Sequence, residues 1–140
     1  MNIVLDTNVL VAGLLTPFGP CGEIVRMVSA GSLSLCYDAR ILIEYHEVLR
    51  RSKFNFNAEK TASLLDYIEY RGCVAASAPL PKPLPDPDDE PFLAVAIAGR
   101  AVCLVTGNSK HYLPELREGV KVFSPSEFIA FYKKRKEAKK

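Results

Sequence analysis

The sequence predicts an α/β fold in which helices cover both faces of a mostly parallel central sheet. Short apolar runs without alternating polarity recur along the chain, as is typical of strands buried on both faces. Segments with apolar residues at helical spacing separate these runs. Alternation of this kind favours a three-layer α/β/α sandwich with right-handed crossovers between its strands.

The first half of the chain is expected to contain two strands and three helices. In order they are a strand at 3–5, a helix at 22–30, a strand at 33–37, and helices at 39–51 and 57–72. Gly31 follows the first of these helices as a stop signal, and Asn57 can cap the third.

The second half begins with a proline-rich connector. Every second residue from Pro79 to Pro87 is proline, which predicts a stiff extended path without a regular strand ladder. A recognition ligand for an aromatic groove is the alternative for this segment. A buried helix is expected at 92–98, and strands at 101–105 and 121–123. Ser124 to Glu127 then forms a capping box that begins the last helix.

Charge is distributed unevenly over the 140 residues, a length that suits one domain. Residues 133–140 contain six basic side chains and one acidic one, whereas residues 1–132 carry a net charge of −3. We therefore expect a single acidic domain at 1–132 followed by a basic tail at 133–140. This tail could supply phosphate contacts that an acidic body lacks.

Other features favour a cytoplasmic protein without a membrane partner. No run approaches the roughly eighteen apolar residues of a membrane span, and the N-terminus lacks the pattern of a signal peptide. The four cysteines form no C-x-x-C pair. Cys36 and Cys103 stand in apolar runs and are expected to be buried, reduced thiols.

Two polar triplets follow predicted strands. They are Asp6-Thr7-Asn8 and Thr106-Gly107-Asn108. Because ligands of open parallel sheets bind beyond the carboxyl ends of the strands, both triplets are candidates for a site. Asp6 taken alone is equally compatible with the N-cap of a short helical turn at 9–12.

Glu44 lies on the apolar face of its predicted helix, three residues after one isoleucine and four before a valine. A carboxylate there is costly unless it is paired or bound to a cation. Glu44 is thus a candidate ligand, with a buried ion pair as the alternative. Glu47 is expected to pair with Arg51 at the surface, and His46 is expected to be a surface residue.

A third acidic group, Asp86-Pro87-Asp88-Asp89-Glu90, precedes the expected helix at 92–98. The helix dipole accounts for one or two acids there, but not for four. Crowded carboxylates repel one another unless a divalent cation lies among them. Oxygen ligands without a His or Cys companion favour Mg²⁺ or Mn²⁺ over zinc. Such a site is suited to activating water against a phosphodiester.

Together these segments resemble the PIN domain, in particular the toxin-like PIN proteins of prokaryotes. The matching segments are 3–10, 42–51, 86–99 and 104–108, in this order. The resemblance implies a PIN-like fold and a Mg²⁺- or Mn²⁺-dependent ribonuclease that cleaves single-stranded RNA. It also implies a small antitoxin protein as partner, and a homodimer.

By the family pattern, the core acidic ligands and catalytic residues would be Asp6, Glu44 and Asp89. Asp86 and Asp88 would then be supporting or alternative metal ligands. The resemblance further implies that Asn8 and Thr106 orient the acids. Asn108 stands where the family commonly has a fourth acid, a departure that bears on whether a second metal binds.

Two other functions remain open at this point. The first is an inactive PIN-like scaffold that binds RNA or protein; Asn108 and the acidic body favour it, and the intact set of three acids opposes it. The second is a phosphatase of the HAD type with Asp6 as its nucleophile. That reaction usually needs a second Asp two residues later, where this chain has Asn8.

Overall fold

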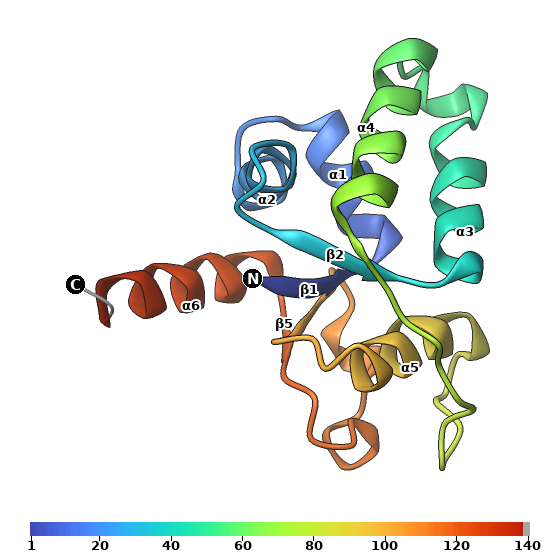
Figure 1. Cartoon of the computed structure of the whole chain (residues 1–140), viewed down its shortest axis with the longest axis vertical. Helices are drawn as coiled ribbons and strands as arrows, with labels where there is room; N and C mark the ends of the chain where they lie inside the picture. The colour runs from blue at the N-terminus through green and yellow to red at the C-terminus, as the bar shows by residue number, and fades with distance from the viewer. Residues whose placement is uncertain (139–140) are drawn as a thin grey trace.

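The structure, a computed structural model, describes residues 1–138, and its centre is a five-stranded sheet (Figure 1). The strands are β1 (Asn2–Leu5), β2 (Ser34–Tyr37), β3 (Cys73–Val74), β4 (Leu104–Val105) and β5 (Val122–Phe123). Their spatial order is β3-β2-β1-β4-β5, and all four pairings are parallel. The α/β class expected from the sequence is therefore confirmed.

Helices cover both faces of this sheet. Within residues 1–138 they are α1 (Thr7–Leu15), α2 (Pro20–Ser29), α3 (Ala39–Leu49), α4 (Ala58–Arg71), α5 (Glu90–Ala98) and α6 (Pro125–Ala138). In Figure 1, α1, α2 and α4 lie above the sheet and α5 lies below it. This arrangement is the predicted three-layer sandwich.

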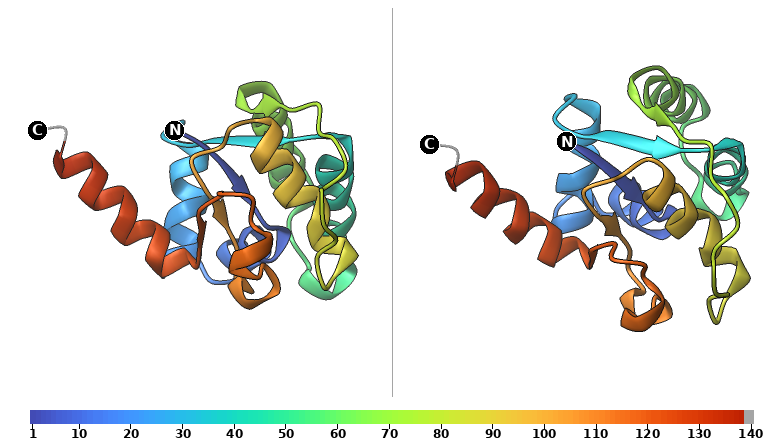
Figure 2. Two further views of the ribbon diagram at one scale, coloured as in Figure 1. Left: turned by 90° about the horizontal axis from the view of Figure 1, so that it is seen from below. Right: turned by 60° about the horizontal axis from the view of Figure 1, so that its bottom comes forward.

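The order of the strands reverses direction at β1. The chain moves from β1 to β2 and β3 on one side, then returns beneath the sheet through α5 to place β4 on the other side of β1 (Figure 2). Leu5 pairs with Val105, and the amide of Asp6 donates to the carbonyl oxygen of Val105 at 2.9 Å. The loops after β1 and β4 thus leave the sheet side by side, where parallel sheets bind their ligands.

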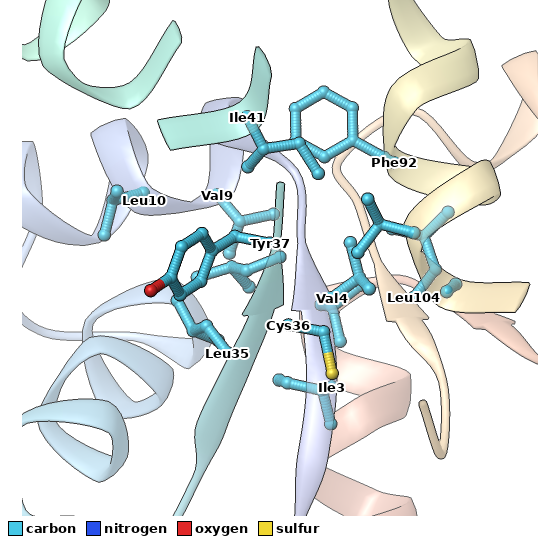
Figure 3. Packing of buried hydrophobic residues seen from close by; sticks show 14 of the residues in the cluster. Ile3, Val4, Val9, Leu10, Leu35, Cys36, Tyr37, Ile41, Phe92 and Leu104 are labelled. Atoms are coloured by element: carbon cyan, nitrogen blue, oxygen red, sulfur yellow. The ribbon is translucent and has the colours of Figure 1, made fainter. Parts of the chain in front are cut away.

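The core is continuous across the central strands (Figure 3). Ile3, Val4 and Leu5 are fully buried, as expected for a strand with helices on both faces. Tyr45 of α3 is also fully buried, and its hydroxyl donates to the carbonyl oxygen of Leu5. This bond fixes α3 against the end of β1.

Several smaller predictions are confirmed as well. Cys36 and Cys103 are buried free thiols. Ser124 and Glu127 form the reciprocal hydrogen bonds of a capping box, at 2.8 and 3.2 Å. Residues 75–86 contain neither helix nor strand, in keeping with a connector.

The structure differs from the sequence predictions at three elements. A nine-residue helix, α1, stands where the sequence offered only a short helical turn at 9–12 as one alternative; after Thr7 and Asn8 its residues are all apolar or glycine, which hid the helical period. Strand β3 was not predicted, because two residues show no periodicity. Strand β4 is limited to Leu104–Val105 rather than 101–105, although the amide of Val102 still bonds to Asn2 at 2.8 Å.

The basic residues Lys133 to Lys136 continue α6 as a helix. Figures 1 and 2 show α6 projecting from the end of the molecule where β1 begins, away from the carboxyl ends of the strands. Lys139 and Lys140 of the expected tail lie outside the described residues. In the described chain no single helix is long and apolar enough to cross a membrane; α1 and α2 reach that composition only as a pair bent by 100°.

Candidate metal centre at the carboxyl edge of the sheet

Asp6 is the most buried acid of the candidate site, with 6% of its surface exposed. It occupies the N-cap position of α1, but its side chain makes no capping hydrogen bond. Its Oδ2 instead accepts a hydrogen bond from Thr106 Oγ1 at 2.8 Å and one from the Tyr112 hydroxyl at 3.4 Å. The side chain is thus turned toward the residues that follow β4 rather than toward its own helix.

Glu44 approaches Asp6 from α3. Its Oε2 accepts a hydrogen bond from the hydroxyl of Thr7, the residue that follows Asp6. In the part of the chain that the structure describes, Glu44 forms no ion pair, so the alternative of a buried pair is wrong. Glu47 does pair with Arg51, at 3.7 Å, as the spacing predicted.

Asp89 completes the group from the start of α5. Its side chain is 13% exposed and its Oδ2 lies 3.3 Å from His111 Nδ1. That oxygen is buried and has no hydrogen bond of acceptable geometry. An orphaned carboxylate oxygen is unusual in a protein interior and calls for an unseen partner such as an ion or water.

The neighbouring acids Asp86 and Asp88 have separate positions. Asp86 caps the short 3₁₀ turn Pro87–Asp89, since its Oδ1 accepts from the amide of Asp88 at 3.0 Å. Ligand atoms of Asp86, Asp89 and His111 lie within 4.8 Å of one another. Asp88 is exposed, and its negative charge contributes to raising the pKa of Glu44.

The two polar triplets are brought together, as the sequence predicted. Thr106 is fully buried, and its Oγ1 accepts from the amide of Asn108 at 3.0 Å while it donates to Asp6. Asn8 Oδ1 accepts from the amide of Gly107 at 3.1 Å. Asn8 and Thr106 therefore hold the two loops together, and the Asn108 side chain forms no cap for the turn Ser109–His111 that follows it.

Burial raises the pKa of all three acids. For Asp6 the loss of hydration outweighs the hydrogen bond from Thr106, so its pKa lies above 3.8. Burial also raises the pKa of Glu44, to which the charges of Asp6 and Asp88 add. For Asp89, burial and the charges of Asp6 and Asp86 raise the pKa to about 6, against an opposing effect of His111.

A divalent cation would offset both the burial of these carboxylates and the repulsion between their charges. Mutually repelling carboxylates, one with an orphaned buried oxygen, are a donor set that suits Mg²⁺ or Mn²⁺. The ligand atoms that lie close enough to hold one ion are those of Asp86, Asp89 and His111. Asp6 and Glu44 are not part of that group, but Asp6 is close enough for its charge to raise the pKa of both Asp89 and Glu44, so both remain candidate ligands beside it. Thr106 and Tyr112 would keep Asp6 in its orientation.

The parallel sheet and the acids that follow its strands define an α/β protein with a candidate acidic metal site. The sequence profile of the PIN domain matches residues 2–110. The chain therefore belongs to the PIN domain family, whose members are generally metal-dependent nucleases. No curated protein matches the chain.

Sequence reasoning missed three residues of this centre. Thr7 was treated only as part of a triplet, and Tyr112 followed no recognised motif. His111 was not linked to the acids, because its contact with Asp89 spans separate elements. Polar residues three and four positions after the second triplet were the only available signal. His46, expected at the surface, is half-buried and lines a cavity between α3 and α4.

Proposed function

We propose that this PIN domain is a Mg²⁺- or Mn²⁺-dependent endoribonuclease that hydrolyses single-stranded RNA. The observation that carries the proposal is the convergence of Asp6, Glu44 and Asp89 from three separate elements, where burial first and the charge of neighbouring acids second raise the pKa of Glu44 and Asp89. A scaffold that only binds RNA has no need of this costly arrangement. The phosphatase alternative lacks its second acid, because residue 8 is Asn. The side chain of Asn8 is moreover engaged by the amide of Gly107 in the loop after β4.

The protein's own contribution is to hold and orient the acids. Hydrogen bonds from Thr106 and Tyr112 hold the carboxylate of Asp6, and a hydrogen bond from Thr7 holds that of Glu44. Asp89 presents a buried oxygen whose one near neighbour that could donate is His111 Nδ1, at 3.3 Å and without the geometry of a hydrogen bond. A cation held there would lower the pKa of a bound water and neutralise charge on the phosphodiester. Asp88 and Asp86 at the rim lie where they would help to retain a hydrated ion.

The proposal is tested by replacing Asp6 with Asn. The variant keeps the shape of the side chain but loses its charge, so manganese-dependent cleavage of a single-stranded RNA should largely disappear. The metal-free fold should be as stable as before or more stable, because repulsion falls. Asp66→Asn, at an exposed position of α4, is the matched control. Undiminished cleavage by Asp6→Asn would overturn the assignment, and saturable RNA binding without any cleavage by the wild type would favour the scaffold.

The resemblance to toxin-like PIN proteins extends the proposal to partners: a small antitoxin protein that covers the acidic site, and a second copy of the chain. Ile43, next to Glu44, is 64% exposed, and Phe18 is 88% exposed. Large exposed apolar side chains of this kind support protein contacts. Light scattering of the purified chain over a range of concentrations would establish whether it is a dimer.

A further inference from the structure

The candidate metal centre needs cations nearby if it is to receive RNA. Residues 1–132 are acidic overall, and the helical part of the basic segment projects from the opposite end of the molecule (Figure 2). A strand that lies across Asp6, Glu44 and Asp89 therefore requires phosphate contacts from another surface.

A cavity between α3 and α4 has the composition of such a surface. Its volume is about 320 Å³, at the lower end of the range for small-molecule sites. Its lining is His46, Leu49, Arg50, Arg51, Ser52, Asn55, Phe56, Ala58, Thr61, Ala62 and Leu65. The lining includes two arginines and no acid, in a domain whose net charge is negative.

Three features of this cavity suit a nucleotide. Arg50 is exposed, and the side chain of Arg51 is 48% exposed although it also pairs with Glu47. The first turn of α4 forms part of the wall, where the positive end of the helix dipole favours an anion, although Glu59 in the same turn offsets part of that charge. Phe56 supplies an aromatic wall, and it is stacked on Phe54 with ring centroids 5.4 Å apart. Aromatic side chains beside arginines are the usual platform for unpaired bases.

The helix α3 relates the cavity to the acids. Glu44 belongs to α3, and Arg50 is its C-cap. At about 1.5 Å and 100° per residue the two positions are separated by about 9 Å along the helix axis and by about 120° around it. A strand cleaved beside Glu44 would therefore pass around the end of α3 to enter this cavity.

A larger cavity beside the start of α3 does not compete for this role. It has a volume of about 620 Å³, but its lining contains Asp38 and Glu90 as well as Arg40. Arg40 is already held by Asp38 at 2.7 Å and by Ser77 at 2.8 Å. Its charge is therefore largely compensated.

We propose that the cavity between α3 and α4 is a nucleotide-binding subsite for the single-stranded RNA substrate. In this subsite Arg50 and Arg51 contact phosphate, and Phe56 stacks against a base. The inference rests on the proposed ribonuclease function, and it adds where part of the RNA substrate binds. A protein segment is the competing occupant, and measurements of RNA binding and molecular mass distinguish the two.

The test measures binding and cleavage separately. Binding of a fluorescein-labelled oligouridylate is followed by anisotropy in chelator at several salt concentrations, with the full chain. Replacing both Arg50 and Arg51 with Ala should reduce affinity and lower the slope of log K against log[salt] by about 1.4, at ~0.7 for each phosphate that is no longer neutralised. Phe56→Leu keeps an apolar side chain and removes the aromatic face. It should weaken binding roughly 5- to 150-fold, corresponding to ~1–3 kcal/mol for a base that is no longer stacked, without a change in slope.

Cleavage with Mn²⁺ provides the second readout. Removing a side chain that binds the substrate away from the reacting atoms should raise KM and leave kcat at saturating RNA nearly unchanged. The matched control is Arg71→Ala, an exposed arginine at the far end of α4, which should change neither affinity nor KM. Urea unfolding of each variant separates loss of binding from loss of fold.

The outcomes distinguish this inference from the proposed function. Oligouridylate binding that depends on Arg50, Arg51 and Phe56 in a protein that does not cleave would overturn the ribonuclease and keep the subsite. Normal cleavage with an affinity and salt slope equal to those of Arg71→Ala would overturn the subsite alone. Unchanged RNA binding together with an altered molecular mass in light scattering would assign the cavity to a protein contact and also overturn the subsite.

Discussion

Thr106 donates a hydrogen bond of 2.8 Å to Asp6 across 100 residues of sequence. The bond joins the ends of β1 and β4, the two strands that flank the switch point of the sheet. The same hydroxyl oxygen accepts from the amide of Asn108, so its proton is directed toward the carboxylate. One threonine thus orders both the first acid of the site and the loop that carries Asn108 and His111.

This arrangement predicts a large effect of Thr106→Val, which keeps the side-chain shape but removes the hydroxyl. Unfolding of the metal-free protein should require about 1–3 kcal/mol less free energy, because Asp6 loses its strongest hydrogen bond. Affinity for Mn²⁺ should fall about 10- to 100-fold, since Asp6 is no longer oriented. Urea unfolding in chelator and isothermal titration calorimetry measure the two effects. Thr106→Ser restores the donor and should behave like the wild type; equal losses in both variants would mean that the bond itself is unimportant.

The three acids of the candidate site could be predicted from the sequence, but the side chains that hydrogen-bond to Asp6 could not. Asp6, Glu44 and Asp89 could be identified because a carboxylate beside apolar residues is conspicuous in a pattern. Whether Asp6 caps its helix or faces the site could not be decided, since both uses need the same residue type at the same position. Only the path of β4 beside β1 places Thr106 and Tyr112 against it. Strand β3 was missed for a related reason: its two residues are ordered by their neighbour β2 and not by local pattern.

The raised pKa of Asp89 predicts how the stability of the metal-free protein depends on pH. The folded pKa is about 6 and the ordinary value is 3.8, so between them the folded state binds more protons than the unfolded state. Protonation of Asp89 therefore contributes stability that is fully present below pH 4 and lost as the pH rises through 6. Asp89→Asn should be more stable than the wild type above pH 6, by roughly 1–2 kcal/mol.

Urea unfolding in chelator from pH 4 to pH 8 would show this difference. The two proteins should converge toward pH 4, because folded Asp89 is protonated there and the unfolded group begins to bind its proton only near 3.8. With saturating Mn²⁺ the order should reverse above pH 6, because only the wild type retains the ligand. A constant difference between the two metal-free proteins over the whole range would contradict the raised pKa.

Asn108 allows the charge of the site to be increased by one. Its side chain does not cap the following turn, and its amide bonds to Thr106, the residue that holds Asp6, so a carboxylate at this position would add its charge next to the site. Asn108→Asp should lower the Mn²⁺ concentration for half-maximal cleavage by roughly tenfold, since charges about 4 Å apart interact by ~1–4 kcal/mol. The same change should destabilise the metal-free protein through added repulsion. Asn108→Ala is the control, and an unchanged metal dependence in Asn108→Asp would mean that position 108 is only a loop residue.

His111 introduces a nitrogen into a centre that is otherwise built of oxygen. Its Nδ1 lies 3.3 Å from the orphaned Oδ2 of Asp89, and 48% of its side chain is exposed. In a bound state it could either contact the cation or serve only as a partner for Asp89. A nitrogen ligand favours Mn²⁺ and Co²⁺ over Mg²⁺, which prefers oxygen. The two roles therefore differ in metal preference rather than in affinity alone.

We expect His111→Ala to weaken Mn²⁺ binding by about tenfold or more and to change Mg²⁺ binding much less. Competition titrations against a fluorescent chelator give both constants, and the visible absorption of bound Co²⁺ should change with the loss of the nitrogen. His111→Asn can still donate a hydrogen bond to Asp89, so it should recover stability without recovering the preference for Mn²⁺. Equal weakening of both cations in His111→Ala, fully reversed in His111→Asn, would instead show that His111 acts only by positioning Asp89.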